Sequence, residues 1–270
     1  MAVGTGFQMS WLVLLLLLVI VGLFWKYPAL RRTWYWLPRR GLVALMYHHI
    51  GLLTNPAEER YPFTISPEMF EKQLLFLKQH GYTPISEAAA VQAYKFGKSL
   101  VKKPVLFTFD DGHEDNYTFL FPLLQKYQVP VLIFLITDRV GTPGYLTWEQ
   151  IKEMQQSGLV YFGSHTCSHR RLRHLSDEEI NQEVVNSKRV LEEKLGTSVY
   201  SFCYPFGSGG FDKRVRPFVL QAGYLLDFST QKGINPWPKK GKSSLLRAFP
   251  RGGESLWEYY LQLTRGRSRL

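Results

Sequence analysis

Short apolar runs alternate with longer amphipathic stretches from about residue 41 to the C-terminus. The apolar runs are rich in Val, Leu, Ile and Phe and have the length of buried strands. They predict strands over 42–47, 105–109, 131–136, 160–163, 200–203, 225–228 and 245–249. This alternation predicts repeated β–α units, arranged either as a (β/α) barrel or as an open doubly wound sheet.

Three of the intervening helices have clear start and stop signals. A capping residue precedes each apolar stripe, and a glycine follows it. The opening pairs are Ser66-Pro67, Thr147 with Gln150, and Ser176 with Glu179, and the closing glycines are Gly81, Gly158 and Gly196. We interpret the apolar stripes of these helices as core.

The N-terminal region has a different pattern, because residues 11–25 are apolar without interruption. A membrane span needs about 20 such residues, and a core helix is rarely apolar on every face. Residues 1–10 carry no charged side chain and no small-residue cleavage site follows, which favours an uncleaved anchor over a removed signal peptide. We therefore predict an anchor at 1–25, a basic linker at 26–40 and one domain at 41–270.

Composition and charge refine this prediction. An apolar fraction of 45% and a charged fraction of 20% are those of a globular protein rather than a disordered one. Five of the cations behind the net charge of +11 lie in residues 26–40, where there is no acid. Such a stretch beside a span favours lipid headgroups over nucleic acid as its partner. The positive-inside rule would keep this flank in the cytoplasm, which conflicts with the function inferred below.

Polar residues follow the predicted strands, where α/β folds collect their chemistry. Asp110, Asp111 and Gly112 come directly after the strand at 105–109. Two adjacent carboxylates repel each other, and a metal ion or a catalytic role would compensate that cost. The alternative is an Asp-Gly turn with two solvated acids.

His165 and His169 follow the strand at 160–163. Their i, i+4 spacing places both imidazoles on one face of a helical turn, a geometry that holds one metal ion. Two histidines and one aspartate would leave coordination positions open for water and substrate, while the second aspartate accepts a proton. Cys167 at i+2 points away from that face. HExxH and G-x-S-x-G motifs are absent, which argues against that type of zinc protease and against a serine nucleophile.

Three motifs give a specific resemblance. They are Thr108-Phe109-Asp110-Asp111-Gly112, His165-Thr166-Cys167-Ser168-His169 and Tyr204-Pro205-Phe206-Gly207. In content and order they resemble the first three motifs of the polysaccharide deacetylase family, also called the NodB-homology domain or carbohydrate esterase family 4. The resemblance implies a distorted (β/α) barrel of the NodB-homology type, preceded here by the predicted transmembrane helix.

The resemblance also implies the roles of the site residues. Asp110 would be the general base, and Asp111, His165 and His169 would hold one divalent metal ion, zinc or alternatively cobalt or nickel. The backbone N–H of Phe206 would stabilise the oxyanion, and Tyr204 of the same motif would be the second oxyanion or substrate residue.

The chain departs from the family pattern at two places. Members commonly end with a Leu-x-His strand whose histidine is the general acid, whereas His48-His49-Ile50 follows the first predicted strand here. This resembles the permuted subgroup that includes the poly-N-acetylglucosamine deacetylases, so His48 is the candidate acid and His49 its alternative. Cys203 stands where many relatives have an arginine that orients the base, and Arg247 is a candidate substitute.

The resemblance implies a metal-dependent hydrolase that removes N-acetyl groups from a β-linked N-acetylglucosamine polymer outside the cytoplasm, foremost a poly-N-acetylglucosamine exopolysaccharide of biofilms. Peptidoglycan and chitin are alternative substrates. A catalytically silent carbohydrate-binding domain is the alternative from another class, against which the intact set of acids and histidines argues. Nucleic-acid binding is not expected, because it would rest on net charge alone.

Overall fold

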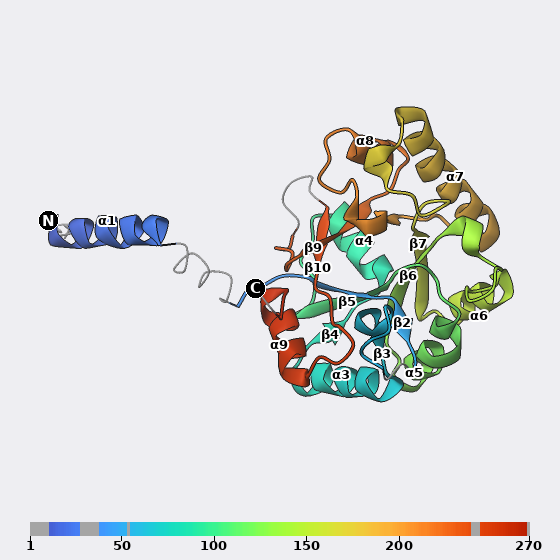
Figure 1. The fold of residues 1–270 in the computed structure, drawn as a ribbon, viewed down its shortest axis with the longest axis horizontal. Coiled ribbons are helices and arrows are strands. Elements are labelled where there is room, and N and C mark those ends of the chain that lie inside the picture. Colours follow the sequence, from blue (N-terminus) through green and yellow to red (C-terminus); the bar gives the residue numbers. More distant parts are fainter. Residues whose placement is uncertain (1–10, 28–37, 53–54, 239–243, 269–270) are drawn as a thin grey trace, which may run out of the picture. The chain divides into compact units, whose positions relative to one another are not determined.

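The computed structural model describes residues 11–27, 38–52, 55–238 and 244–268 (Figure 1). The chain divides into an N-terminal unit and one large domain, Arg39–Arg269. In the N-terminal unit, helix α1 comprises Trp11–Lys26 and is built from Leu, Val and other apolar residues.

The predicted transmembrane anchor is not confirmed. Within the ranges described, no helix combines the length and the apolarity that crossing a bilayer requires. Helix α1 has 16 residues, whereas a span needs about 20. The remainder of the predicted anchor, residues 1–10, and most of the predicted basic linker lie outside the described residues.

The large domain is built on an eight-stranded sheet whose neighbouring strands are all parallel. Seven strands follow the order β1-β5-β6-β7-β8-β9-β10, and the short β4 pairs with β5. The strands are β1 (Val43–Tyr47), β4 (Thr83–Pro84), β5 (Pro104–Phe109), β6 (Val131–Leu135), β7 (Val160–Ser164), β8 (Ser201–Cys203), β9 (Leu226–Lys232) and β10 (Leu245–Arg247). Residues in β1, β5 and β6 are buried throughout, as expected for strands covered on both faces.

The sheet curls into a nearly closed barrel. Leu45 of β1 bridges in parallel to Ala248, which directly follows β10. Two backbone hydrogen bonds of 2.8 Å support this contact, from Met46 N to Ala248 O and from Ala248 N to Ala44 O. The first strand of the domain therefore occupies the ring position between β10 and β5, as the predicted permuted barrel requires.

Helices cover the outside of the barrel (Figure 1). They are α3 (Pro67–Gln79), α4 (Glu87–Lys95), α5 (Phe121–Tyr127), α6 (Trp148–Gln156), α7 (Asp177–Leu195), α8 (Val215–Gln221) and α9 (Leu256–Arg265). The predicted caps form: Ser66 accepts a bond from Met69 N, and Thr147 and Ser176 each make a full capping box.

Seven predicted strands are confirmed to within a few residues. The structure adds elements that the sequence did not indicate, among them β4 and a separate pair, β2 (His49–Ile50) and β3 (Thr64–Ile65). A π-helical turn, Asn116–Leu120, precedes α5. Such turns lose regular helix hydrogen bonding and often occur at functional sites.

Candidate active site

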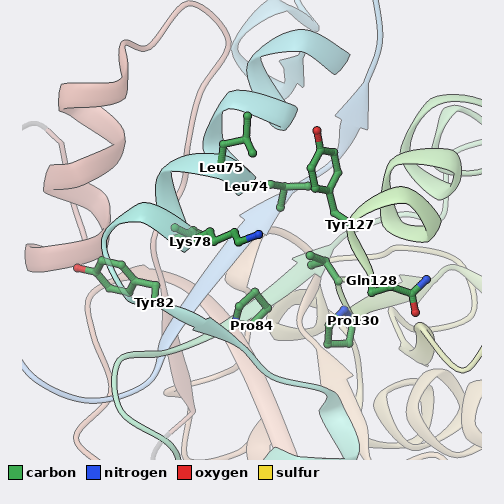
Figure 2. A pocket seen from close by; sticks show the side chains of 10 residues that line it. Leu74, Leu75, Lys78, Tyr82, Pro84, Tyr127, Gln128 and Pro130 are labelled. Carbon is green, nitrogen blue, oxygen red and sulfur yellow. The ribbon is translucent and has the colours of Figure 1, made fainter.

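Two hollows of the domain lie at opposite ends of its strands. A groove between α3 and the residues before β6 contains Leu74, Lys78, Tyr82 and Tyr127 (Figure 2). It carries no histidine or carboxylate. A cleft of about 470 Å³ lies at the carboxyl ends of the strands. It is lined by six of the seven predicted site residues: His48, Asp110, Asp111, His165, His169 and Phe206.

The backbone is strained around this cleft. Four non-glycine residues there have φ between +56° and +74°, namely Asp111, Thr166, His169 and Phe206. Such conformations persist only where the surrounding structure enforces them, and they concentrate at functional sites. Gly112 has φ +75°, and a Cβ on it would lie 2.6 Å from Leu135 Cδ2, so this position requires glycine.

Asp111, His165 and His169 form a cluster suited to a metal ion, with one ligand atom from each within 4.8 Å of the others. Asp111 Oδ1 lies 3.4 Å from His165 Nε2 and 3.3 Å from His169 Nε2. The predicted helical turn between the histidines is wrong. The chain there is irregular, and left-handed residues at Thr166 and His169 bring the rings together, with Thr166 Oγ1 accepting a 3.0 Å bond from His169 N.

The atoms around this cluster fit a cation. Asp111 Oδ1 is buried and has no hydrogen-bond partner among the residues that the structure describes, which is costly unless a cation contacts it. His165 Nδ1 is 2.7 Å from Cys203 O, so it is the donor and Nε2 is left with a free lone pair. His113 Nε2 lies 3.3 Å from Asp111 Oδ2 and orients the carboxylate. Burial, and then neighbouring His165, lower the pKa of His169 to about 4, so its ring is neutral as a ligand must be.

Asp110 forms a buried ion pair with Arg247. Arg247 donates from Nη1 and Nη2 to the two carboxylate oxygens at 2.7 and 2.8 Å. Burial alone would raise the pKa of Asp110, but the guanidinium outweighs it and holds that pKa below its ordinary value. Arg247 also contacts Cys203 Sγ at 3.1 Å. Its guanidinium therefore lies beside Cys203, the residue for whose missing arginine Arg247 is the candidate substitute.

A second donor set, Asp110, His165 and Cys203, is equally compact but less suited to a metal. Both oxygens of Asp110 are already bonded to Arg247. Complete burial raises the pKa of the Cys203 thiol well above its ordinary value, so the thiolate needed for ligation is disfavoured. The free Nε2 of His165 faces Asp111 instead.

The two candidate acids differ in their surroundings. His48 Nε2 is 3.9 Å from Asp110 Oδ2, and its ring packs edge-on against Phe63 and Phe249. Burial lowers the pKa of His48 despite the nearby Asp110. His49 Nδ1 instead pairs with Asp115 Oδ2 at 2.6 Å. Of the two histidines, His48 is therefore the one that faces Asp110.

The remaining predicted residues divide between cleft and core. Phe206 is half-exposed, and the centroid of its ring lies 4.6 Å from that of the His169 ring, with the two rings tilted. Tyr204 is fully buried, and its hydroxyl donates to Asp227 Oδ2 at 3.1 Å, so the structure does not bring this side chain to the cleft. Cys167 faces the backbone of α7, and burial raises the pKa of its thiol to about 11.

Sequence reasoning missed the layer of residues that supports the site. The His113 ring stacks on the His49 ring with 3.8 Å between their centroids, and it also contacts Asp111. Asn116, at the start of the π-helical turn, donates to His48 O at 3.0 Å and ties the β1–β2 junction to the segment after β5. The run of polar residues after Gly112 was the available signal, since a simple turn needs no such side chains.

Comparisons with known proteins agree with this geometry. The sequence profile described as "Polysaccharide deacetylase" matches residues 97–226. The chain is 32% identical, over 79% of its length, to the poly-beta-1,6-N-acetyl-D-glucosamine N-deacetylase of Escherichia coli (strain K12). It is 30% identical, over 71% of its length, to a protein of the polysaccharide deacetylase type from Bacillus subtilis (strain 168). It spans 36% and 65% of these two relatives.

Among solved structures, a deacetylase of Streptococcus pyogenes in complex with acetate superposes with a TM-score of 0.75 at 29% identity. The match covers 84% of this chain and 99% of that one. The barrel, the motifs and these similarities agree. In its sequence profile over residues 97–226, its motifs and its fold, the domain is similar to the polysaccharide deacetylase family.

Proposed function

We propose that this protein is a metal-dependent deacetylase that removes N-acetyl groups from a β-linked N-acetylglucosamine polymer, foremost poly-N-acetylglucosamine. One observation carries the proposal: the cluster of Asp111, His165 and His169 shares a cleft with the ion-paired Asp110 and with His48. The name of the Escherichia coli relative supports this polymer as the substrate.

Asp111, His165 and His169 would hold one divalent ion, and a ligand set of one carboxylate and two imidazoles suits zinc, cobalt or nickel. Such an ion supplies Lewis-acid polarisation of the acetamide carbonyl and makes water acidic enough to attack near neutral pH. The ligand set leaves positions open for substrate and water, which distinguishes it from a closed structural site.

The protein's own residues would then move the protons. Asp110, kept ionised by Arg247, accepts the proton of the attacking water. His48 donates a proton to the departing sugar amine, and because burial keeps its ring neutral at rest, Asp110 at 3.9 Å is the group that can charge it. The N–H of Phe206 is the candidate oxyanion donor. The products are acetate and a cationic glucosamine unit.

We further propose that the domain acts outside the cytoplasm, held at a membrane by the N-terminal segment. The extracellular nature of the substrate and the exposed apolar side chains of α1, such as Leu15, Leu16 and Leu18, support this location. A reporter enzyme that is active only outside the cytoplasm, fused after Leu270, tests it. An inactive reporter with normal expression would contradict the location.

The decisive experiment measures acetate release from poly-N-acetylglucosamine oligomers by the full chain, with and without a chelator, beside Asp110→Asn. We expect release that the chelator and the substitution abolish, and that the surface control variant Lys152→Gln retains. Release from peptidoglycan or chitin fragments alone would change the substrate and keep the mechanism. Binding without release from any of these polymers would favour the carbohydrate-binding alternative.

A further inference from the structure

The catalytic cleft is lined by cations as well as by catalytic residues. Arg60, Lys232 and Arg251 belong to the same cleft as the metal cluster. Arg171 adds a fourth cation, because its guanidinium lies 4.0 Å from the ring centroid of Phe206, which also lines the cleft. Among the described residues, the carboxylates that line this space are Asp110, Asp111 and Glu59.

Arg60, Arg171 and Arg251 at the cleft differ in their partners from six other arginines of the domain. Six arginines pair with carboxylates: Arg170, Arg173, Arg189, Arg214, Arg216 and Arg247. Among the described residues, no carboxylate forms an ion pair with Arg60, Arg171 or Arg251. Arg251 lies instead over the Phe249 ring at 5.3 Å, and Arg171 over Phe206.

Several cations without carboxylate partners at one cleft cost electrostatic free energy when the cleft binds only neutral sugars. Like charges around a half-enclosed space repel each other, and neutral hydroxyl and acetamide groups compensate that repulsion poorly. The Phe63 ring, which is exposed at the cleft, already provides an apolar face on which a neutral sugar can stack. A guanidinium held on an aromatic ring keeps its outer N–H groups free, and these match a phosphate or carboxylate in two-point geometry.

We propose that the cleft recognises an acidic group, phosphate or carboxylate, carried by the N-acetylglucosamine polymer on or beside the sugar that is deacetylated. This inference rests on the proposed deacetylase function and narrows its substrate class. The same cations also favour release of the product, because each deacetylated unit is itself cationic and is repelled by the cleft.

The test compares three probes with the full chain. The first is a neutral β-linked N-acetylglucosamine pentamer, the second carries one muramic acid unit with its carboxylate, and the third carries one sugar 6-phosphate. We expect kcat/KM for acetate release to be about tenfold higher for at least one acidic pentamer than for the neutral one, which corresponds to one charge-assisted contact. The preference should shrink as salt rises from low concentration to about 0.5 M, because exposed charges are screened.

Variants assign the preference to the cleft. Arg251→Gln and Arg60→Gln should each lower the ratio of acidic to neutral kcat/KM by about three- to tenfold. Lys152→Gln removes the same charge from the exposed surface of α6 and should leave that ratio unchanged. Thermal melts check that the variants are folded, and binding of the pentamers to Asp110→Asn measures the same preference without turnover.

The outcomes separate the two levels of inference. Equal values for neutral and acidic pentamers, or a preference that Arg251→Gln and Arg60→Gln leave intact, would overturn the acidic substrate while the deacetylase function stands. Absence of acetate release from all three pentamers, with no difference in their binding, would overturn both. The acid with the larger preference identifies whether phosphate or carboxylate is the recognised group.

Discussion

The buried pair between Arg247 and Asp110 makes a strong prediction about stability. The Arg247 side chain is fully buried, and besides Asp110 it donates to Ser229 O at 2.9 Å and to Thr108 Oγ1 at 3.1 Å. Arg247→Met fills a similar volume but leaves the carboxylate of Asp110 buried without its cation. Removing one partner of a buried ion pair costs about 3–5 kcal/mol in the free energy of unfolding.

That loss is a large share of the roughly 5–15 kcal/mol by which domains are stable. At about 2–4 °C per kcal/mol for a domain of this size, the melting temperature should fall by roughly 10 °C. Urea denaturation of the full chain, followed by circular dichroism, measures the change. Because the proposed metal ligands, Asp111, His165 and His169, are separate from this ion pair, zinc affinity should fall much less than acetate release does.

A double-mutant cycle distinguishes lost pairing from lost packing. The double variant Asp110→Asn, Arg247→Met contains neither charge, so it should be more stable than Arg247→Met alone, with a coupling of about 2 kcal/mol or more. Additive effects of the two substitutions, or an Arg247→Met variant within about 1 kcal/mol of the unaltered protein, would refute the claim that Asp110 depends on this cation.

Three further predictions concern other parts of the domain. His169→Ala should weaken zinc binding at least about a hundredfold by titration calorimetry, since one of three ligands is lost; unchanged affinity would exclude His169 as a ligand. Ser176→Ala removes the α7 capping box with Glu179 and should cost about 1 kcal/mol in urea denaturation; no loss would show that the box is not stabilising. Burial raises the pKa of Glu87, so its carboxyl group keeps its proton to a higher pH in the folded state than in the unfolded state. Stability therefore falls as pH rises from the ordinary pKa of 4.5 to the raised pKa of the folded state. Glu87→Gln should therefore flatten the fall and stabilise the protein at pH 7, and an unaltered pH profile would contradict the assignment.

The sequence was informative where burial and local chemistry coincide. The strands were predictable because parallel strands covered on both faces must be continuous apolar runs. The capping residues were predictable because a helix end needs a local hydrogen-bond partner. Strands of two residues, such as His49–Ile50 and Thr83–Pro84, carry too few side chains to produce a pattern.

The sequence indicated which residues form the cluster suited to a metal ion, but not the contacts that support them. The residue types at 165–169 fitted a helical turn, and only tertiary constraint places Thr166 and His169 in left-handed conformations. Arg247 is 137 positions from Asp110, so its pairing depends on how the barrel closes rather than on any local motif. Tyr204 lies within a family motif, yet its hydroxyl is bonded to Asp227, and motif membership alone did not reveal that it points into the core.

The ring position of β1 explains why the candidate catalytic residues meet. In the register of β1 and β5, Tyr47 pairs with Phe109, so the residues that follow them, His48 and Asp110, emerge side by side at the same end of the barrel. On its other side β1 contacts Ala248, which places the preceding Arg247 next to Asp110. The site therefore requires β1 between β10 and β5, but it does not require that this strand come first or last in the chain. A permuted sequence can keep the proposed acid and base together because the sheet order, and not the chain order, determines which strand ends are neighbours.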